Sequence, residues 1–222
     1  MNKQELLSMI ELSGLAYGEH QPLDKDERVY KFNSEKTGVQ YSVRILGDTI
    51  KIIFRGTDSL IDAMTDFRFW RKSIPYGNYY SKIKVHNGFI NAYKCEDVRD
   101  EIHTFITNDI EKIWITGHSY GAALACLCAI DLQYNFPEKD YEVALFGCPR
   151  LGNSAFQRSY DKRIFKTIRV ENGNDVITKL PFAWMGFRHI GTRLHVGSPR
   201  ILFLYSVKQH KSQSYYEQMI KL

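Results

Sequence analysis

The sequence predicts an α/β protein with a central, mostly parallel sheet and helices on both of its faces. Short β-branched runs alternate with helix-forming segments from residue 49 onward, which is typical of parallel sheets covered by helices. A Gly-rich turn at residues 117–121 also separates a buried-strand pattern from an Ala-rich helical run. The 222 residues contain neither an internal repeat nor a linker-like shift in composition, so we expect one domain over residues 1–222.

The elements of the N-terminal half follow from the spacing of apolar residues. Leucine and isoleucine side chains that share one helical face predict a helix over residues 3–17. Strands are expected at residues 29–32, 39–46 and 49–54, where β-branched and aromatic residues are dense. A second helical pattern predicts a helix over residues 91–108.

In the C-terminal half, short apolar runs alternate with helical patterns. Strands are expected at residues 113–116, 141–146 and 165–170, with helices at 122–132 and 154–162 between them. The last expected element is a hairpin formed by residues 193–196 and 201–207 around Gly197-Ser198-Pro199. Together these elements complete the alternation that the parallel sheet requires.

The composition is that of an ordinary globular protein and excludes several classes. Hydrophobic residues make up 44% of the chain and charged residues 25%, which is too apolar for an intrinsically disordered chain. Thirty Lys and Arg against 25 Asp and Glu give a net charge of +5, below the clustered excess typical of nucleic-acid binding. We therefore expect no nucleic-acid partner. The sequence also lacks an apolar stretch near the ~20 residues that a membrane span needs.

The first residues and the cysteines predict a cytoplasmic protein. Residues 1–7 lack the uninterrupted apolar run of a signal peptide. The four cysteines, at positions 95, 126, 128 and 148, do not have the spacing of a zinc site. A chain of this length can build a core without crosslinks, so we expect the cysteines to be reduced and to pack as small hydrophobic residues.

The strongest chemical signal is the sequence Gly117-x-Ser119-x-Gly121 between the expected strand 113–116 and the expected helix 122–132. This order of strand, turn and helix is that of a nucleophile elbow, in which a tight turn exposes a serine at the N-terminus of a helix. Small residues on both sides of the serine let the strand and the helix approach closely. The helix dipole there favours the negative charge that develops during acyl transfer.

A serine nucleophile needs a base, and the base needs an orienting acid. In the order found in α/β hydrolases, both follow the serine along the chain. Acidic residues after Ser119 are Asp131, Glu138, Asp140, Glu142, Asp161, Glu171 and Asp175. Asp175 is favoured because it lies in a loop after a strand, at the edge where parallel sheets build their sites. The alternative is that Asp175 serves only the turn, since Asn-Gly-Asn-Asp is also a turn sequence.

Three downstream histidines could act as the base: His189, His195 and His210. His210 is favoured because it follows the expected strand 201–207 in a polar loop, and His189 is the next candidate. His118 precedes the nucleophile and would point away from it, so we expect a structural role for His118.

Several motifs together resemble the class 3 lipase family, also called fungal-type lipases. In chain order they are Phe54-Arg55-Gly56-Thr57, Val85-His86-Asn87-Gly88-Phe89, Gly117–Gly121, Gly147-Cys148-Pro149-Arg150-Leu151-Gly152-Asn153 and Arg169–Asp175 with Leu180-Pro181, within roughly residues 12–215. The resemblance implies an α/β-hydrolase fold and a triad of Ser119, Asp175 and His210. It also implies an oxyanion hole formed by Thr57 and the backbone N–H of Tyr120.

Three positions compare informatively with the family pattern. Ala122 stands where the family usually has a second glycine, and residues 189–193 resemble a His-x-Gly-x-Glu stretch in which Arg193 replaces the acid. The family often has a tyrosine shortly after the base, and Tyr215 resembles it. Because the residues between His210 and Tyr215 are generic, the choice between His210 and His189 stays open at this point.

The segment 58–72 is a candidate lid over the site. Its apolar residues at helical spacing, with one aromatic residue beyond them, are Leu60, Ile61, Met64, Phe67 and Trp70. Spacing alone favours a core helix, whereas the resemblance places a short helical lid here. Basic residues in and near the segment are Arg68, Arg71, Lys72, Lys82 and Lys84. They could attract an anionic lipid surface or simply form a solvated basic face, and the sequence does not decide between these.

The sequence therefore predicts a serine carboxylester hydrolase that acts on lipid esters, either acylglycerols or phospholipids. This chemistry requires neither a metal nor another cofactor. Two alternatives stay open: a non-lipid acyl hydrolase, such as an aryl esterase or thioesterase, and a catalytically silent lipid-binding or interaction protein. A chain of 222 residues leaves no room for a separate cap domain, and no pattern in it indicates the oligomeric state.

Overall fold

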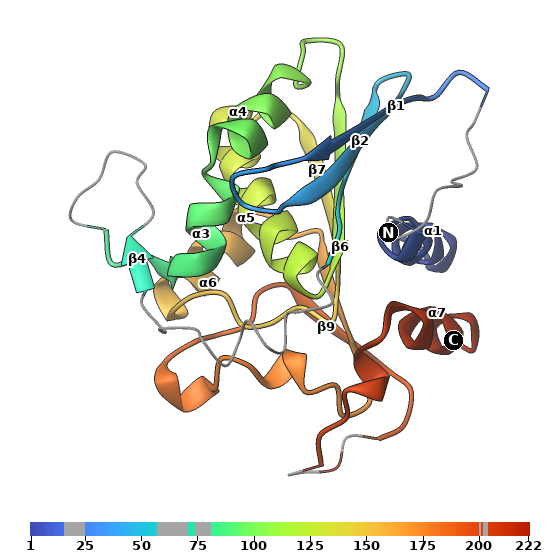
Figure 1. Cartoon of the computed structure of the whole chain (residues 1–222), viewed down its shortest axis with the longest axis vertical. Coiled ribbons are helices and arrows are strands. Elements are labelled where there is room, and N and C mark those ends of the chain that lie inside the picture. The colour runs from blue at the N-terminus through green and yellow to red at the C-terminus, as the bar shows by residue number, and fades with distance from the viewer. Residues whose placement is uncertain (16–24, 57–70, 74–80, 200, 202–203) are drawn as a thin grey trace.

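The computed structural model describes residues 1–15, 25–56, 81–199, 201 and 204–222, and the backbone of residues 71–73. A seven-stranded sheet runs through this part of the chain in the order β1-β2-β3-β6-β7-β8-β9 (Figure 1). Its strands are β1 Arg28–Asn33, β2 Gln40–Leu46, β3 Thr49–Phe54, β6 Lys112–His118, β7 Asp140–Phe146, β8 Thr167–Asn172 and β9 Thr192–Val196. The first three strands are antiparallel, and β3, β6, β7, β8 and β9 run parallel to one another.

Helices cover both faces of this sheet (Figure 1). The N- and C-terminal helices, α1 Lys3–Leu15 and α7 Ser212–Ile220, pack together on one face. The other face carries α3 Asn87–Tyr93, α4 Glu96–Thr104, α5 Tyr120–Asn135 and α6 Ser154–Arg163. Short 3₁₀ turns are η1 Ile177–Lys179, η2 Ala183–Met185 and η3 Lys208–His210. A separate two-stranded sheet joins β4 Arg71–Ser73 to β5 Lys84–His86.

The two faces of the sheet have separate hydrophobic cores. The larger one surrounds α5, whose residues 121–132 are buried on every side. Such a helix is apolar all round because it has no solvent face. The smaller core lies beneath α1 and α7 and includes Met9, Phe146, Tyr215 and Met219. The sheet is thereby fixed from both sides, and its carboxyl-terminal edge can position side chains accurately.

The predicted α/β architecture is confirmed, but the expected helix over residues 91–108 is two helices. The chain becomes extended at Cys95, where φ is −61° and ψ is 138°. The first helix begins earlier than expected, because the Nδ1 atom of His86 accepts the N–H of Gly88. The second begins with Glu96 and Asp97, whose charges suit a helix N-terminus. Apolar spacing alone conceals such a break because both helices face the same core.

The expected hairpin over 193–196 and 201–207 is wrong. Its first half is strand β9, which pairs in parallel with β8, and the described residues of its second half, 201 and 204–207, form no continuous strand. Ser206 instead forms an isolated bridge with Asp175, and its N–H donates to the carbonyl of Asn174 at 2.9 Å. Among the described residues of this second half, Ile201, Leu204, Tyr205 and Val207 have exposed side chains. Bonds to the Asp175 loop therefore take the place of a ladder with β9.

One expected strand is displaced in the structure, and two elements of the structure were not expected. The strand expected at 165–170 is β8, shifted two residues onward, because Phe165 is exposed and the pairing with β7 begins at Thr167. Helix α7 and strand β5 were not anticipated. The four cysteines are free as expected, three of them buried and Cys95 half-buried. In the described part of the chain, no helix is long and apolar enough to span a membrane.

Candidate active site

Ser119 lies in the sharp turn between β6 and α5, with φ of 60° and ψ of −124°. A positive φ is costly for a residue with a side chain, so the surrounding structure must impose it. The N–H of Ser119 donates to the carbonyl of Phe146 on the neighbouring strand at 2.9 Å, which fixes the turn to the sheet. Ser119 therefore has the strained backbone that a nucleophile elbow requires.

The two glycines of the motif are required by close approach. A Cβ atom at Gly117 would lie 2.4 Å from the backbone of Gly121. A Cβ atom at Gly121 would lie 2.4 Å from the carbonyl oxygen of Phe54 at the end of β3. Helix α5 can therefore begin directly against β3 and β6 only if both residues lack side chains. The helix packs against both strands.

Three side chains from distant parts of the chain meet at this turn. The Nε2 atom of His210 lies 2.7 Å from the Oγ atom of Ser119. On the other side of the ring, the Nδ1 atom of His210 lies 2.8 Å from the Oδ2 atom of Asp175. With Nδ1–H donating to the carboxylate, Nε2 carries a lone pair and accepts the serine proton. This is the arrangement of nucleophile, base and orienting acid that activates a serine.

The carboxylate of Asp175 is held by donors on both of its oxygens. Its side chain is 0% exposed, and its Oδ1 atom accepts the N–H of Ile177 at 2.9 Å. The hydroxyl of Tyr215 on α7 donates to Oδ2 beside His210. Burial raises the pKa of Tyr215, so this phenol keeps its proton and stays a donor. A side chain at Gly147 would collide with this pair, because a Cβ atom there would lie 2.9 Å from the His210 ring.

The backbone around His210 is held by two buried groups. The Nε2–H of His118 donates to the carbonyl of His210 at 2.6 Å, and the two rings lie 4.6 Å apart. Burial lowers the pKa of His118 to about 3, so its ring is neutral. The amide of Asn172 donates to the carbonyl of Gln209 at 3.0 Å. His118 thus bonds directly to the loop that carries His210.

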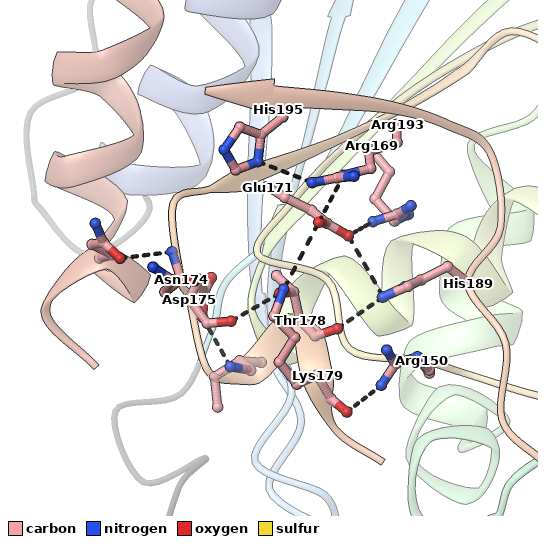
Figure 2. Close-up of polar contacts among 12 residues, drawn as sticks. Arg150, Arg169, Glu171, Asn174, Asp175, Thr178, Lys179, His189, Arg193 and His195 are labelled. Carbon is pink, nitrogen blue, oxygen red and sulfur yellow. Dashed lines mark hydrogen bonds and ion pairs between the residues drawn. The ribbon is translucent and has the colours of Figure 1, made fainter. Parts of the chain in front are cut away.

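The other histidines lie elsewhere. The Nε2–H of His189 donates to the carbonyl of Thr178 at 2.8 Å, beside the Asp175 loop (Figure 2). His195 bonds to Arg193 and to the carbonyl of Ser198. The structure therefore brings His210, and neither His189 nor His195, to Ser119.

Of the two expected oxyanion residues, Tyr120 lies within the described part of the chain. Tyr120 is the first residue of α5, and the N–H groups of a helix's first turn have no partner within the helix. Its N–H is thus available beside Ser119. Thr57 lies outside the described residues, which reach Gly56 just beyond the end of β3. Because Phe54 on β3 pairs with Gly117 on β6, the strand that leads toward Thr57 ends beside the elbow.

Most of the candidate lid also lies outside the described residues, including Leu60, Ile61, Met64, Phe67 and Trp70. At its carboxyl end, Arg71 and Lys72 belong to strand β4 and so are not helical. Lys82 and Lys84 have exposed side chains. Large apolar side chains that lie between Asp175 and His210 along the chain are exposed, which the sequence did not predict. They are Phe182, Trp184, Ile201, Leu204, Tyr205 and Val207.

The sequence also did not indicate a buried charged cluster next to the Asp175 loop, centred on Glu171 (Figure 2). Glu171 had only been one of several acids that follow Ser119. The residues of this cluster are far apart in the sequence, and only the resemblance to the His-x-Gly-x-Glu stretch drew attention to Arg193. Among the described residues, no group of three or more His, Cys, Asp or Glu side chains is arranged to hold a metal ion.

The fold and this arrangement of side chains define the α/β-hydrolase class. The model of the lipase (class 3) family matches residues 51–185, and the chain belongs to this family. A secreted mono- and diacylglycerol lipase of Malassezia globosa is 33% identical over 63% of this chain and 49% of its own length. Another from Malassezia restricta is 30% identical over 78% of this chain and 57% of its own length.

A solved structure is similar in fold. It is the structure of a triacylglycerol lipase whose catalytic centre is described as a serine protease triad. It superposes with a TM-score of 0.72 and 26% identity, over 86% of this chain and 79% of that chain. The chain spans about half the length of the curated relatives it matches.

The relatives correct one expectation. A cytoplasmic location was predicted, but relatives from Malassezia are named secreted lipases, so that prediction is wrong. The free cysteines do not decide the compartment, because a chain of this size can bury enough apolar surface to fold without crosslinks in either environment.

Proposed function

We propose that this protein is a serine hydrolase that cleaves carboxylic esters of lipids, with Ser119 as nucleophile, His210 as base and Asp175 as orienting acid. The observation that carries the proposal is the continuous line of hydrogen-bonded atoms from Ser119 Oγ through the His210 ring to Asp175 Oδ2, with distances of 2.7 and 2.8 Å. The proposal covers residues 1–222 as one domain.

In the acylation step, the Ser119 hydroxyl proton passes to Nε2 of His210 as Oγ bonds to the ester carbonyl carbon. The carbonyl electron pair moves onto oxygen, and Asp175 stabilises the imidazolium that forms. Collapse of the tetrahedral intermediate breaks the bond to the alcohol, which leaves with the proton from Nε2. Water then gives a proton to Nε2, attacks the acyl group and releases the acid, and Ser119 regains its proton.

The negative oxygen of the intermediate requires donors that are already in place. The backbone N–H of Tyr120 is one, because it lies in the first turn of α5 directly after the nucleophile. Thr57 is the second, through its backbone N–H and hydroxyl, and this assignment rests on the family motif. Losing one such donor typically costs ~10²–10³ in rate.

Lipid esters are the substrate class that best fits both the relatives and the surface. The relatives from Malassezia are named mono- and diacylglycerol lipases, and the similar solved structure is of a triacylglycerol lipase. Exposed apolar side chains in the segments between Asp175 and His210 along the chain suit contact with an apolar substrate phase, and Trp184 is 82% exposed. The segment 58–72 would act as the lid, and a lipid surface would be a peripheral partner.

A panel of substrates tests this proposal. Acylglycerols, phospholipids, soluble short-chain esters, feruloyl esters and thioesters would be compared for wild type and Ser119→Ala. We expect hydrolysis of acylglycerols and soluble esters by wild type, and a loss on the order of 10⁶-fold in kcat in the variant. Preference for feruloyl esters or thioesters would contradict the substrate class. Turnover that survives in Ser119→Ala would contradict the mechanism.

A further inference from the structure

The proposed chemistry leaves one set of buried charges without a role (Figure 2). Glu171 lies near the end of β8, and its side chain is 3% exposed. It forms ion pairs with Arg169 on the same strand and with Arg193 on β9, where Arg193 Nε lies 2.9 Å from Oε2. The Nζ atom of Lys179, in η1, lies 4.0 Å from the same oxygen. One carboxylate thus faces cations from three elements.

These charges depend on one another because water reaches few of them. Burial would raise the pKa of Glu171, but Arg169, His189 and Lys179 together bring it down to about 2. The carboxylate is therefore ionised at neutral pH. The side chains of Arg169 and Lys179 are also buried, 6% and 8% exposed, so each needs a nearby negative charge.

The cluster continues directly into the loop that carries the acid. His189 donates to the carbonyl of Thr178, and the Thr178 hydroxyl donates to the carbonyl of Asp175 at 2.8 Å. Arg150 donates to the carbonyls of Lys179 and Pro181, which fixes the other end of η1. Turn η1 thus lies between the charges and Asp175, and its position sets the direction of the Asp175 carboxylate through the N–H of its first residue.

The position of this carboxylate also explains a departure from the family pattern. The stretch 189–193 resembles His-x-Gly-x-Glu, but Arg193 stands where the acid would be. In the structure, Arg193 lies opposite Arg169 in the parallel pairing of β9 with β8, so two residues of like charge are neighbours across the two strands. Glu171, two residues along β8, supplies the negative charge between them.

We propose that Glu171 is a positioning residue: its carboxylate, buried among Arg169, Arg193 and Lys179, holds η1 so that Asp175 points at His210. This inference rests on the proposed function for its effect on catalysis. It assigns to β8 the negative charge that the resemblance placed on β9.

The test compares two buried carboxylates, each changed to its neutral isostere. Glu171→Gln leaves the cations of the cluster without their counter-charge. Glu27→Gln removes the carboxylate from the ion pair of Glu27 with Arg44, whose side chains are 2% and 3% exposed. This pair lies at the β1–β2 edge of the sheet, opposite the edge formed by β8 and β9. We expect both variants to lower Tm. Only Glu171→Gln should lower kcat for a soluble ester, by roughly 10- to 100-fold with little change in KM, because it misdirects a catalytic group.

Two further readouts separate positioning from general destabilisation. The acid limb of the kcat/KM–pH profile should move to lower pH in Glu171→Gln, since an unneutralised cluster of cations disfavours an imidazolium nearby. The downfield proton NMR resonance of the His210–Asp175 hydrogen bond should shift or disappear, and it should be unchanged in Glu27→Gln. This resonance needs no turnover, so it tests the inference even if wild type hydrolyses no ester and the proposed function fails.

A double variant tests whether Glu171 on β8 takes the place of an acidic residue at position 193 on β9. Glu171→Gln with Arg193→Glu returns a carboxylate to a site opposite Arg169, and it should restore the NMR resonance and most of kcat. The inference is overturned if Glu171→Gln matches Glu27→Gln in kcat, pH profile and resonance. It is also overturned if the double variant recovers Tm but neither kcat nor the resonance.

Discussion

Two buried carboxylates lie four residues apart at the carboxyl end of β8, and their surroundings differ in kind. Asp175 is held by the N–H of Ile177, the hydroxyl of Tyr215 and the ring of His210, all of which can be neutral donors. Glu171 is held by the permanent cations of Arg169 and Arg193, with Lys179 4.0 Å away. Both side chains are almost completely buried.

The difference shows how one strand end can carry two carboxylates with separate tasks. A carboxylate surrounded by neutral donors keeps a negative charge that a forming imidazolium can use. A carboxylate already neutralised by guanidinium groups has little to offer a histidine, but it can hold together elements that would otherwise repel. Burial alone therefore does not distinguish Asp175, the proposed catalytic acid, from Glu171, whereas the charge of their partners does.

The largest effect that separates the two is expected from Asp175→Asn. The amide would favour the wrong tautomer of His210, so kcat should fall about 10⁴-fold while the fold persists. Asp131→Asn is the matched control, because Asp131 is also buried but bonds to Tyr93, Arg99 and His103 on the α3–α4 side. Steady-state kinetics on a soluble ester decide the matter. Equal losses in the two variants would remove the distinction drawn for Asp175.

A smaller effect is expected in the pH dependence of the free energy of unfolding. The pKa of Glu171 is lowered from 4.5 to about 2 in the folded protein, so its contribution is present above pH 4.5 and is lost as pH falls toward 2. The contribution is on the order of 3 kcal/mol at neutral pH. Urea unfolding of wild type and Glu171→Gln should show a difference in free energy that shrinks between pH 4.5 and pH 3. A difference that stays constant from pH 7 to pH 3 would contradict the charge-based account.

Asp175 and Glu171 also differ in how far the sequence could predict their surroundings. The elbow at Ser119 and the loop of Asp175 are local: each is set by a few consecutive residues, so their motifs could be recognised. The partners of Glu171 come from β8, η1 and β9, and no spacing along the chain brings them together. A long-range charge cluster leaves no periodic signal, and Arg193 was noticed only as a departure from a family pattern.

The errors in the predicted elements also arise from contacts between residues that are far apart in the sequence. Residues 201–207 have strand-forming side chains, but the backbone of Ser206 bonds to the Asp175 loop, and this tertiary pairing overrides local propensity. Helix α7 was missed because its buried side chains are only Tyr215 and Met219, one helical turn apart. Yet α7 supplies the hydroxyl that bonds to Asp175, so a weak sequence pattern positions part of the site.

The central claim is that Ser119 is a nucleophile activated by His210, and covalent labelling tests it most directly. A fluorophosphonate would be incubated with folded wild type, His210→Ala and His189→Ala, and the adduct located by peptide mass spectrometry. The account predicts a single adduct on Ser119 in wild type and in His189→Ala, and none in His210→Ala. An unlabelled wild type, or labelling that survives in His210→Ala but not in His189→Ala, would contradict it.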